Sequence, residues 1–416
     1  MRVLLRRSLS AAASASGRLG RALSASTSRP PWAMIYDAEE PVKSPGLRAS
    51  FQLAEPPCAS HLRVPENLIN PRPRPDPNGD ILPLIGGGVR AASADGLLLL
   101  DFMDEHATAP IVGRVGAGWA RQIEAFEMDP DRTRFVCNPL SGQLLRLPDI
   151  DGTKKTSKYQ FLGILTQSDS PNRPPDRYAV AWLSDDDGAV EGSFVMRRFL
   201  SQKGEWDDEL VGLPSPLPLA RKMFMSQEVV AFAGRLWWVD VSWGAVSVDP
   251  FSDRPELRFV ELPRGSVTEP VQGLPTLGSS FALQDGGSCW TLEHRVVLER
   301  IGGWADGGYP GLEEAPHIGV IHPLNASVMI LTIGNGSHAV SVDMDRGKAL
   351  GCSLLRGRGG EDPLPHFNGF LKPCVLPPWL GSTLIPSAGT RASTKPNFKS
   401  KTLSDILVRV DRCSKN

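Results

Sequence analysis

The sequence predicts an all-β protein: a β-propeller-like fold of about six blades of short antiparallel strands, with disordered N- and C-terminal tails. Glycine and proline are frequent, at 41 and 37 of 416 residues, which leaves little room for long helices. Apolar runs of strand length alternate with turn signals. Several runs, such as residues 236–239, are apolar at consecutive positions, which predicts strands that are buried on both faces. Blades that pack face to face around an axis bury their strands in this way.

The overall composition excludes several classes of protein. Hydrophobic residues make up 41% and charged residues 22%, so the chain can build a sizeable core. The formal net charge is −1, which argues against a globally basic nucleic-acid binder. No apolar stretch approaches the ~20 residues that span a bilayer, so we expect no transmembrane segment. The six cysteines form no C-x-x-C pair and are expected to be free thiols.

Residues 1–36 have the composition of an organellar transit peptide. The segment contains six arginines and no acidic residue, and serine and alanine fill most of the rest. A positive segment is drawn toward a negatively charged organelle interior. We expect import into the mitochondrion, because dense arginine favours it over the chloroplast, with cleavage near residues 28–34. If the segment is only a disordered tail, the protein is nuclear or cytoplasmic.

Residues 37–83 are expected to form a proline-rich linker and edge segment. The run at residues 71–77 has proline at alternate positions, and each proline lacks an amide donor and has a fixed φ. The propeller-like domain is predicted at residues 84–380. Residues 381–416 are expected to form a loosely ordered basic tail.

A weak repeat within the predicted domain supports the propeller. Asn138, Asp249 and Asp343 each begin a turn between two apolar runs, and they are separated by 111 and 94 residues. Half of each separation is near the ~40–50 residues of a WD40 or kelch blade, and about 300 residues then give six blades, or seven. Asp-Gly and Asn-Gly pairs add hairpin turns between short strands. The alternative is a pair of β-sandwich domains, which would show more one-sided alternation.

Motifs for catalysis and for cofactor binding are absent from the sequence. There is no G-x-x-x-x-G-K-[ST] loop and no G-x-S-x-G elbow, and residues 86–88, three glycines, are expected to form a flexible turn. His317 and His322 are five residues apart, which places them on opposite faces of a strand and not in a joint metal site. No catalytic residue, cofactor or metal ligand is therefore assigned.

Three phrases, at residues 51–60, 134–142 and 232–240, resemble a large plant family known as the domain of unknown function number 1618. That family is similar in style to the kelch-like domains that follow F-boxes. The resemblance covers roughly residues 50–380 and implies a propeller-like β domain and a plant source. It supplies no activity and no catalytic residues. An F-box would be a helical segment ahead of the propeller, and residues 37–80 are too rich in proline for that.

The motifs that can be recognised are structural, and the sequence shows no set of catalytic residues. Together with the N-terminal segment, this predicts a non-catalytic protein-interaction module that is imported into an organelle. Trp119, Trp206 and Trp304 lie next to glycines or charged turns, and we expect them to contact a protein partner, since aromatic residues often supply interface hot spots. Trp237, Trp238 and Trp290 lie in apolar runs and are expected in the core. Two alternatives remain open: an enzyme with a site at the mouth of the propeller channel, and an F-box-type adaptor without a recognisable F-box.

Overall fold

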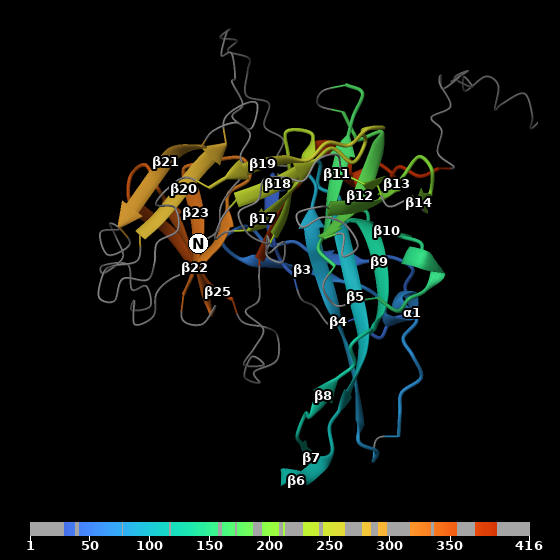
Figure 1. Cartoon of the computed structure of the whole chain (residues 1–416). Helices are drawn as coiled ribbons and strands as arrows, with labels where there is room; N and C mark the ends of the chain where they lie inside the picture. Colours follow the sequence, from blue (N-terminus) through green and yellow to red (C-terminus); the bar gives the residue numbers. More distant parts are fainter. Residues whose placement is uncertain are drawn as a thin grey trace, which may run out of the picture.

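The computed structural model is an all-β propeller, as the sequence predicts, with five blades instead of about six (Figure 1). Each blade is a sheet of four or five strands. The structure describes residues 29–37, 41–76, 78–115, 118–156, 160–170, 173–185, 194–207, 211–212, 228–240, 244–262, 277–283, 290–297, 317–333, 337–355 and 371–388.

The first blade joins the two ends of the described chain. Its strand order is β2-β3-β1-β26, with β1 at Trp32–Tyr36, β2 at Ser50–Gln52, β3 at Ala59–Arg63 and β26 at Leu371–Val375. β1 runs antiparallel to β26 and parallel to β3, and the parallel pair departs from the antiparallel pattern that we expected. Because β1 has a neighbour on both sides, Ala33, Met34 and Ile35 are fully buried.

This blade changes the expected domain boundaries. β1 lies inside the segment expected to be a transit peptide, and β2 and β3 lie inside the expected linker. The sequence carries no local signal for this, because the partner of β1 is a strand more than 300 residues further along the chain. Residues 71–76 are irregular, as predicted. Residues 1–28 and 389–416, which hold most of the two expected tails, lie outside the described residues.

The other four blades follow one another along the chain. The second is β10-β9-β5-β4 with β8 beside β5, the third is β11-β12-β13-β14 with β15 beside β13, the fourth is β16-β17-β18-β19, and the fifth is β22-β23-β24-β25. Their bounds are β4 Ile81–Ala92, β5 Leu98–Thr108, β8 Ala125–Phe126, β9 Asp131–Asn138, β10 Gln143–Arg146, β11 Leu162–Gln167, β12 Arg177–Asp185, β13 Phe194–Leu200, β14 Glu205–Trp206, β15 Val211–Gly212, β16 Glu228–Phe232, β17 Arg235–Asp240, β18 Gly244–Val248, β19 Arg258–Glu261, β22 His317–Ile321, β23 Val328–Ile333, β24 His338–Asp343 and β25 Lys348–Leu354.

Two smaller sheets and three short helices complete the described structure. The sheets pair β6 (Ile111–Val115) with β7 (Gly118–Arg121), and β20 (Leu277–Leu283) with β21 (Trp290–Val297). The helices are α1 (Glu66–Ile69) and the 3-10 turns η1 (Ile150–Gly152) and η3 (Pro378–Gly381). In the part of the chain that is described, no helix has the length and apolar character needed to cross a bilayer.

Two features explain why the blade number is five. The sequence between the fourth and fifth blades, where the repeat would place another blade, contributes only the β20–β21 pair among its described residues. The second blade also takes more chain than a blade of ordinary size, since residues 81–146 form its strands together with the β6–β7 hairpin. Dividing the length of the domain by a standard blade length therefore gives too many blades.

The turns of the predicted repeat are present, although its period is not regular. Asn138 and Asp343 end the third strand of a blade, and Asp249 directly follows one. In each case the side-chain Oδ1 accepts a hydrogen bond from a backbone N–H two residues on, at 2.9–3.1 Å. Such Asx turns hold the hairpin between the third and fourth strands. The three positions are equivalent in the second, fourth and fifth blades, so the 111 residues between the first two span two blades, whereas the 94 residues between the last two span only one. The predicted period, which halved both separations, is therefore wrong for the second.

Burial on both faces is clearest in β17. Trp238 packs into an apolar cluster with Leu236 and Met196, whereas Trp237 packs on the other side with Phe232 and Val260. The indole N–H of Trp238 also donates to the carbonyl of Phe161, just ahead of the third blade, at 3.0 Å. The core prediction for both tryptophans is confirmed, and Trp290 lies in β21.

The three glycines at residues 86–88 are not a turn. They lie in the middle of β4 and pair with Met103, Phe102 and Asp101 of β5. A Cβ atom at Gly87 would lie 2.4 Å from the carbonyl oxygen of Asp101. The glycines are therefore needed for close approach of two strands and not for the flexibility that we expected of them.

Candidate functional site

A long β-arm projects from the second blade (Figure 1). The strands β4 and β5 run well past the blade, the β6–β7 hairpin forms the tip, and β8 lies against the far end of β5. We define the arm as residues 81–85 and 104–129. It begins at Asp104, the last residue of β5 that pairs with β9.

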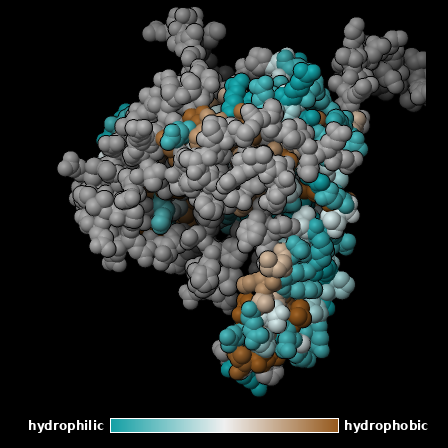
Figure 2. Space-filling model, viewed as in Figure 1, coloured by the Kyte–Doolittle hydropathy of each residue, from teal (hydrophilic) through white to brown (hydrophobic). Residues whose placement is uncertain are grey.

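Large apolar side chains are exposed along the arm. Val112, Phe126 and Met128 are 61%, 51% and 71% exposed, and Ile81 and Ile123 are also exposed. Figure 2 shows brown hydrophobic surface among hydrophilic surface on the projecting arm. Apolar residues that collect on one projecting element are typical of an interaction surface, whereas single exposed ones are ordinary.

A network of charged side chains fixes the base of the arm. Arg72, in the proline-rich segment, donates through Nη2 to Glu127 Oε2 at 2.9 Å, and its backbone N–H donates to Asp104 Oδ2 at 2.6 Å. Lys155 pairs with both Glu127 and Asp131. The expected linker therefore acts as a brace between the second blade and the arm.

The electrostatics of Glu127 reflect this network. Burial alone would raise the pKa of its carboxyl, but hydrogen bonds from Arg72, Lys155 and the backbone N–H of His106 lower it to about 2. A carboxyl with a lowered pKa in the folded state stabilises that state only while it is ionised. The anchor of the arm should therefore weaken in acid.

We expect Glu127→Gln to lower the free energy of unfolding at neutral pH by about 1 kcal/mol, because the hydrogen bonds lose their charge and the site is partly exposed. The stabilisation from the ionised Glu127 is complete when the pH is above 4.5, the ordinary pKa of a glutamate, and it is lost as the pH falls toward the lowered pKa of about 2. The difference in stability between the unchanged protein and Glu127→Gln should therefore shrink over that pH range. The midpoint of urea unfolding, recorded at each pH, measures it. Glu124→Gln, which changes an exposed neighbour, is the control; a constant difference at every pH would contradict the prediction.

A second charged cluster lies inside the second blade. Asp101 on β5 faces Arg132 and Arg134 on β9, and all three side chains are at most 5% exposed. Burial lowers the pKa of Arg134 and the charge of Asp101 opposes that effect, while Arg134 Nη2 donates to Gln160 Oε1 at 2.6 Å. These groups are buried and bound to one another, so the cluster holds the sheet together and offers no surface to a ligand.

The three tryptophans expected to contact a partner do not come together. Trp119 lies in β7, at the tip of the arm, opposite Arg114. Trp206 is 8% exposed: its ring packs edge-on to Phe199, and its Nε1–H donates to the Pro148 carbonyl at 2.8 Å. The expectation of a surface role for Trp206 is corrected, since β14 places the ring in the core. Trp304 lies outside the described residues.

The arm's apolar residues were missed by sequence reasoning. Ile123, Phe126 and Met128 follow neither the two-residue period of a strand nor a helical period, and they alternate with acidic residues. That mixture of apolar and acidic residues in an eight-residue stretch was the available signal.

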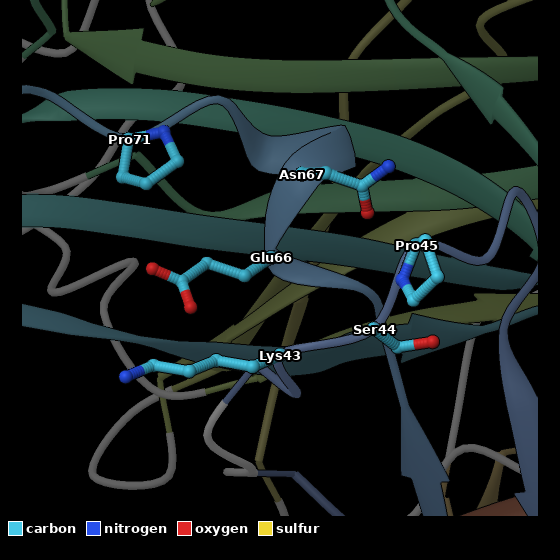
Figure 3. Close-up of a pocket in the computed structure, with 6 residues that line it drawn as sticks. All are labelled: Lys43, Ser44, Pro45, Glu66, Asn67 and Pro71. Atoms are coloured by element: carbon cyan, nitrogen blue, oxygen red, sulfur yellow. The ribbon is translucent and has the colours of Figure 1, made fainter.

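A shallow hollow of about 450 Å³ lies beside α1 (Figure 3). It is lined by Lys43, Ser44, Pro45, Glu66, Asn67 and Pro71. Figure 3 shows the side chains of Lys43 and Glu66 extending to the same side of the hollow. Glu66 is paired with Arg74 at 3.4 Å, and none of the lining groups is a nucleophile held by a base. No group of three His, Cys, Asp or Glu residues within the described ranges is arranged to hold a metal ion.

Comparison with known proteins adds little. No family model matches the chain, and no curated protein matches it. Among solved structures, the chain is similar to AztD from Citrobacter koseri, at 9% identity and a TM-score of 0.27, over 70% of this chain and 82% of that one. The apo form of the same protein gives 8% identity and a TM-score of 0.25 with the same coverage. Similarity at this level supports no conclusion about activity.

Proposed function

We propose that this protein is a non-catalytic protein-binding module and that it binds its partner through the projecting arm. The observation that carries the proposal is the row of exposed apolar side chains on an element that extends away from the propeller. Exposed apolar surface lowers the solubility of a protein. A large patch of it on a soluble protein usually marks a site that a partner covers.

Two further features support this proposal. The arm is braced at its base by Arg72, Glu127 and Lys155, and a binding surface on a rigid support loses less entropy on association. Trp119, one of the three predicted contact residues, lies in the strand at the tip. The propeller then serves as the scaffold, and the arm carries the contact.

The test is a variant in which Asn-Gly replaces residues 110–123 and serine replaces Phe126 and Met128, so that most of the exposed apolar surface of the arm is removed. This joins Ala109 to Glu124 through a two-residue hairpin turn, as the β5–β8 register allows. We expect affinity capture with quantitative mass spectrometry to recover partners with the full chain and not with the shortened one. Leu47→Glu and Leu384→Glu, at exposed positions outside the arm, are the controls. Identical partners for the full and shortened chains would refute the proposal.

We also propose that the protein is imported into the mitochondrion and belongs to the plant family that its sequence resembles. The acid-free, arginine-rich segment supports the first part. The second rests on residues 134–142 and 232–240, which span the β9–β10 turn and the β16–β17 hairpin. Fusion of residues 1–40 to a fluorescent protein tests the import: mitochondrial signal is expected, chloroplast signal would favour the alternative organelle, and diffuse signal would contradict it.

A further inference from the structure

One stretch of the arm differs from the rest of its surface. Every residue from 122 to 129 is exposed except Glu127, which is held by the network at the base. Within this stretch Ile123, Phe126 and Met128 present large apolar side chains. We call residues 122–129 the arm patch.

The exposed charges of the arm patch are both acidic. They are Glu124 and Asp129, and within the described chain neither has an ion-pair partner. Lys155 and Arg72, the nearest cations in the network, are bound to Glu127, Asp104 and Asp131. The surface therefore combines apolar contact area with uncompensated negative charge.

The backbone of the arm patch includes a strand edge. β8 pairs with β5 through Ala107↔Phe126 and Thr108↔Ala125, and in the described structure it has no strand on its other side. On the side of β9 that lies beyond β8, residues 154–156 pair with residues 130–132, and β10 pairs from Phe135 onward. Neither segment pairs with Ala125 or Phe126 of β8. An extended chain that runs beside β8 would add a strand there, a common way of binding peptides.

We propose that the arm patch binds an extended segment of a partner protein that combines apolar side chains with lysine or arginine. The proposal deepens the proposed function and rests on it. Apolar side chains of the segment cover Ile123, Phe126 and Met128, while its basic side chains pair with Glu124 and Asp129. Charge complementarity of this kind sets partner choice and association rate more than total affinity.

The test uses the full chain and two short fluorescein-labelled peptides, one of alternating leucine and lysine and one of alternating leucine and glutamate. Fluorescence anisotropy should give binding of the first peptide at least about tenfold tighter than of the second. Added salt should reduce that preference, because screening weakens exposed charge pairs.

Two double variants separate the contribution of the acidic charges of the arm patch from that of its apolar side chains. Glu124→Gln with Asp129→Asn should remove the preference for lysine, and Phe126→Ser with Met128→Ser should weaken binding about tenfold. The matched controls are Glu55→Gln with Asp253→Asn, and Leu47→Ser with Leu384→Ser, which change the same residue classes at exposed sites elsewhere. All variants alter exposed side chains, so unchanged thermal unfolding confirms that they fold.

Three results would overturn the inference: equal binding of the two peptides, equal weakening by the control variants, or self-association in sedimentation experiments that Phe126→Ser with Met128→Ser abolishes. The last result would assign the surface to a second copy of this chain. Suppose that the protein with the shortened arm loses its captured partners although the full chain binds both peptides with equal affinity. That combination leaves the proposed function in place and refutes only the basic, apolar chemistry assigned to the partner.

Discussion

A chain that begins at residue 37 should fail to form a stable propeller, whereas a chain that begins at residue 29 should fold normally. Removal of β1 takes away Trp32, Met34 and Ile35, which are nearly or fully buried, and each contributes roughly 1.5–3 kcal/mol. The sum is comparable to the whole unfolding free energy of an ordinary domain. It also leaves β3 and β26 without the strand between them.

Thermal unfolding by circular dichroism and limited proteolysis would measure this difference. The longer chain keeps the hydrogen bond from Arg29 to the Pro377 carbonyl at 3.0 Å and all of β1. A truncated chain that fails to fold is often lost on expression, so Met34→Ala with Ile35→Ala in the full chain provides an independent measurement. We expect this double variant to lower the free energy of unfolding by at least about 4 kcal/mol. Equal unfolding temperatures for the two truncated chains would contradict the importance of β1.

Burial of β1 narrows the expected cleavage site of the proposed leader peptide to positions before Trp32. A cut between residues 32 and 34 would remove part of a buried strand that closes the ring. We therefore expect N-terminal sequencing of imported protein to find a mature end before Trp32.

Asp101→Asn should destabilise the protein by about 3–5 kcal/mol. Asp101 is the negative partner of Arg132 and Arg134, and all three are buried in the second blade. Asparagine keeps the shape of aspartate but removes its charge, which leaves two guanidinium groups without compensation at the base of the arm. Urea unfolding at neutral pH measures the loss.

Two companion variants test the cause. Asp149→Asn removes an acid from a more exposed pair with Arg146 and also removes a charge that acts on Arg134 less strongly than Asp101 does. We expect a change below about 1 kcal/mol. Replacement of Asp101, Arg132 and Arg134 together by apolar residues should recover much of the stability, because no unpaired charge then remains buried. If Asp101→Asn is as mild as Asp149→Asn, the buried cluster does not hold the blade.

Local chemistry made the repeated parts of the fold predictable. The Asx turns at Asn138, Asp249 and Asp343 are built from neighbouring residues, so their positions could be read before the structure was known. The same holds for β17, whose consecutive apolar residues indicated burial on both faces. The prediction of a surface position for Trp206 was wrong because it rested on the charged turn beside this residue. The indole N–H bonds to Pro148, which is distant in sequence.

By itself, the sequence determined that the chain folds into short strands, buried on both faces and stacked as blades, because strand patterning and turn chemistry act over a few residues. Only the tertiary structure decided that residues 32–36 close the ring, that the proline-rich segment braces the second blade, and that residues 81–85 and 104–129 extend into an arm. Those outcomes depend on pairings between residues far apart in the chain, and on where the pairing of β5 passes from β9 to β8. No local pattern carries that information, since a strand reads alike whether its neighbour is the next hairpin or the far end of the protein.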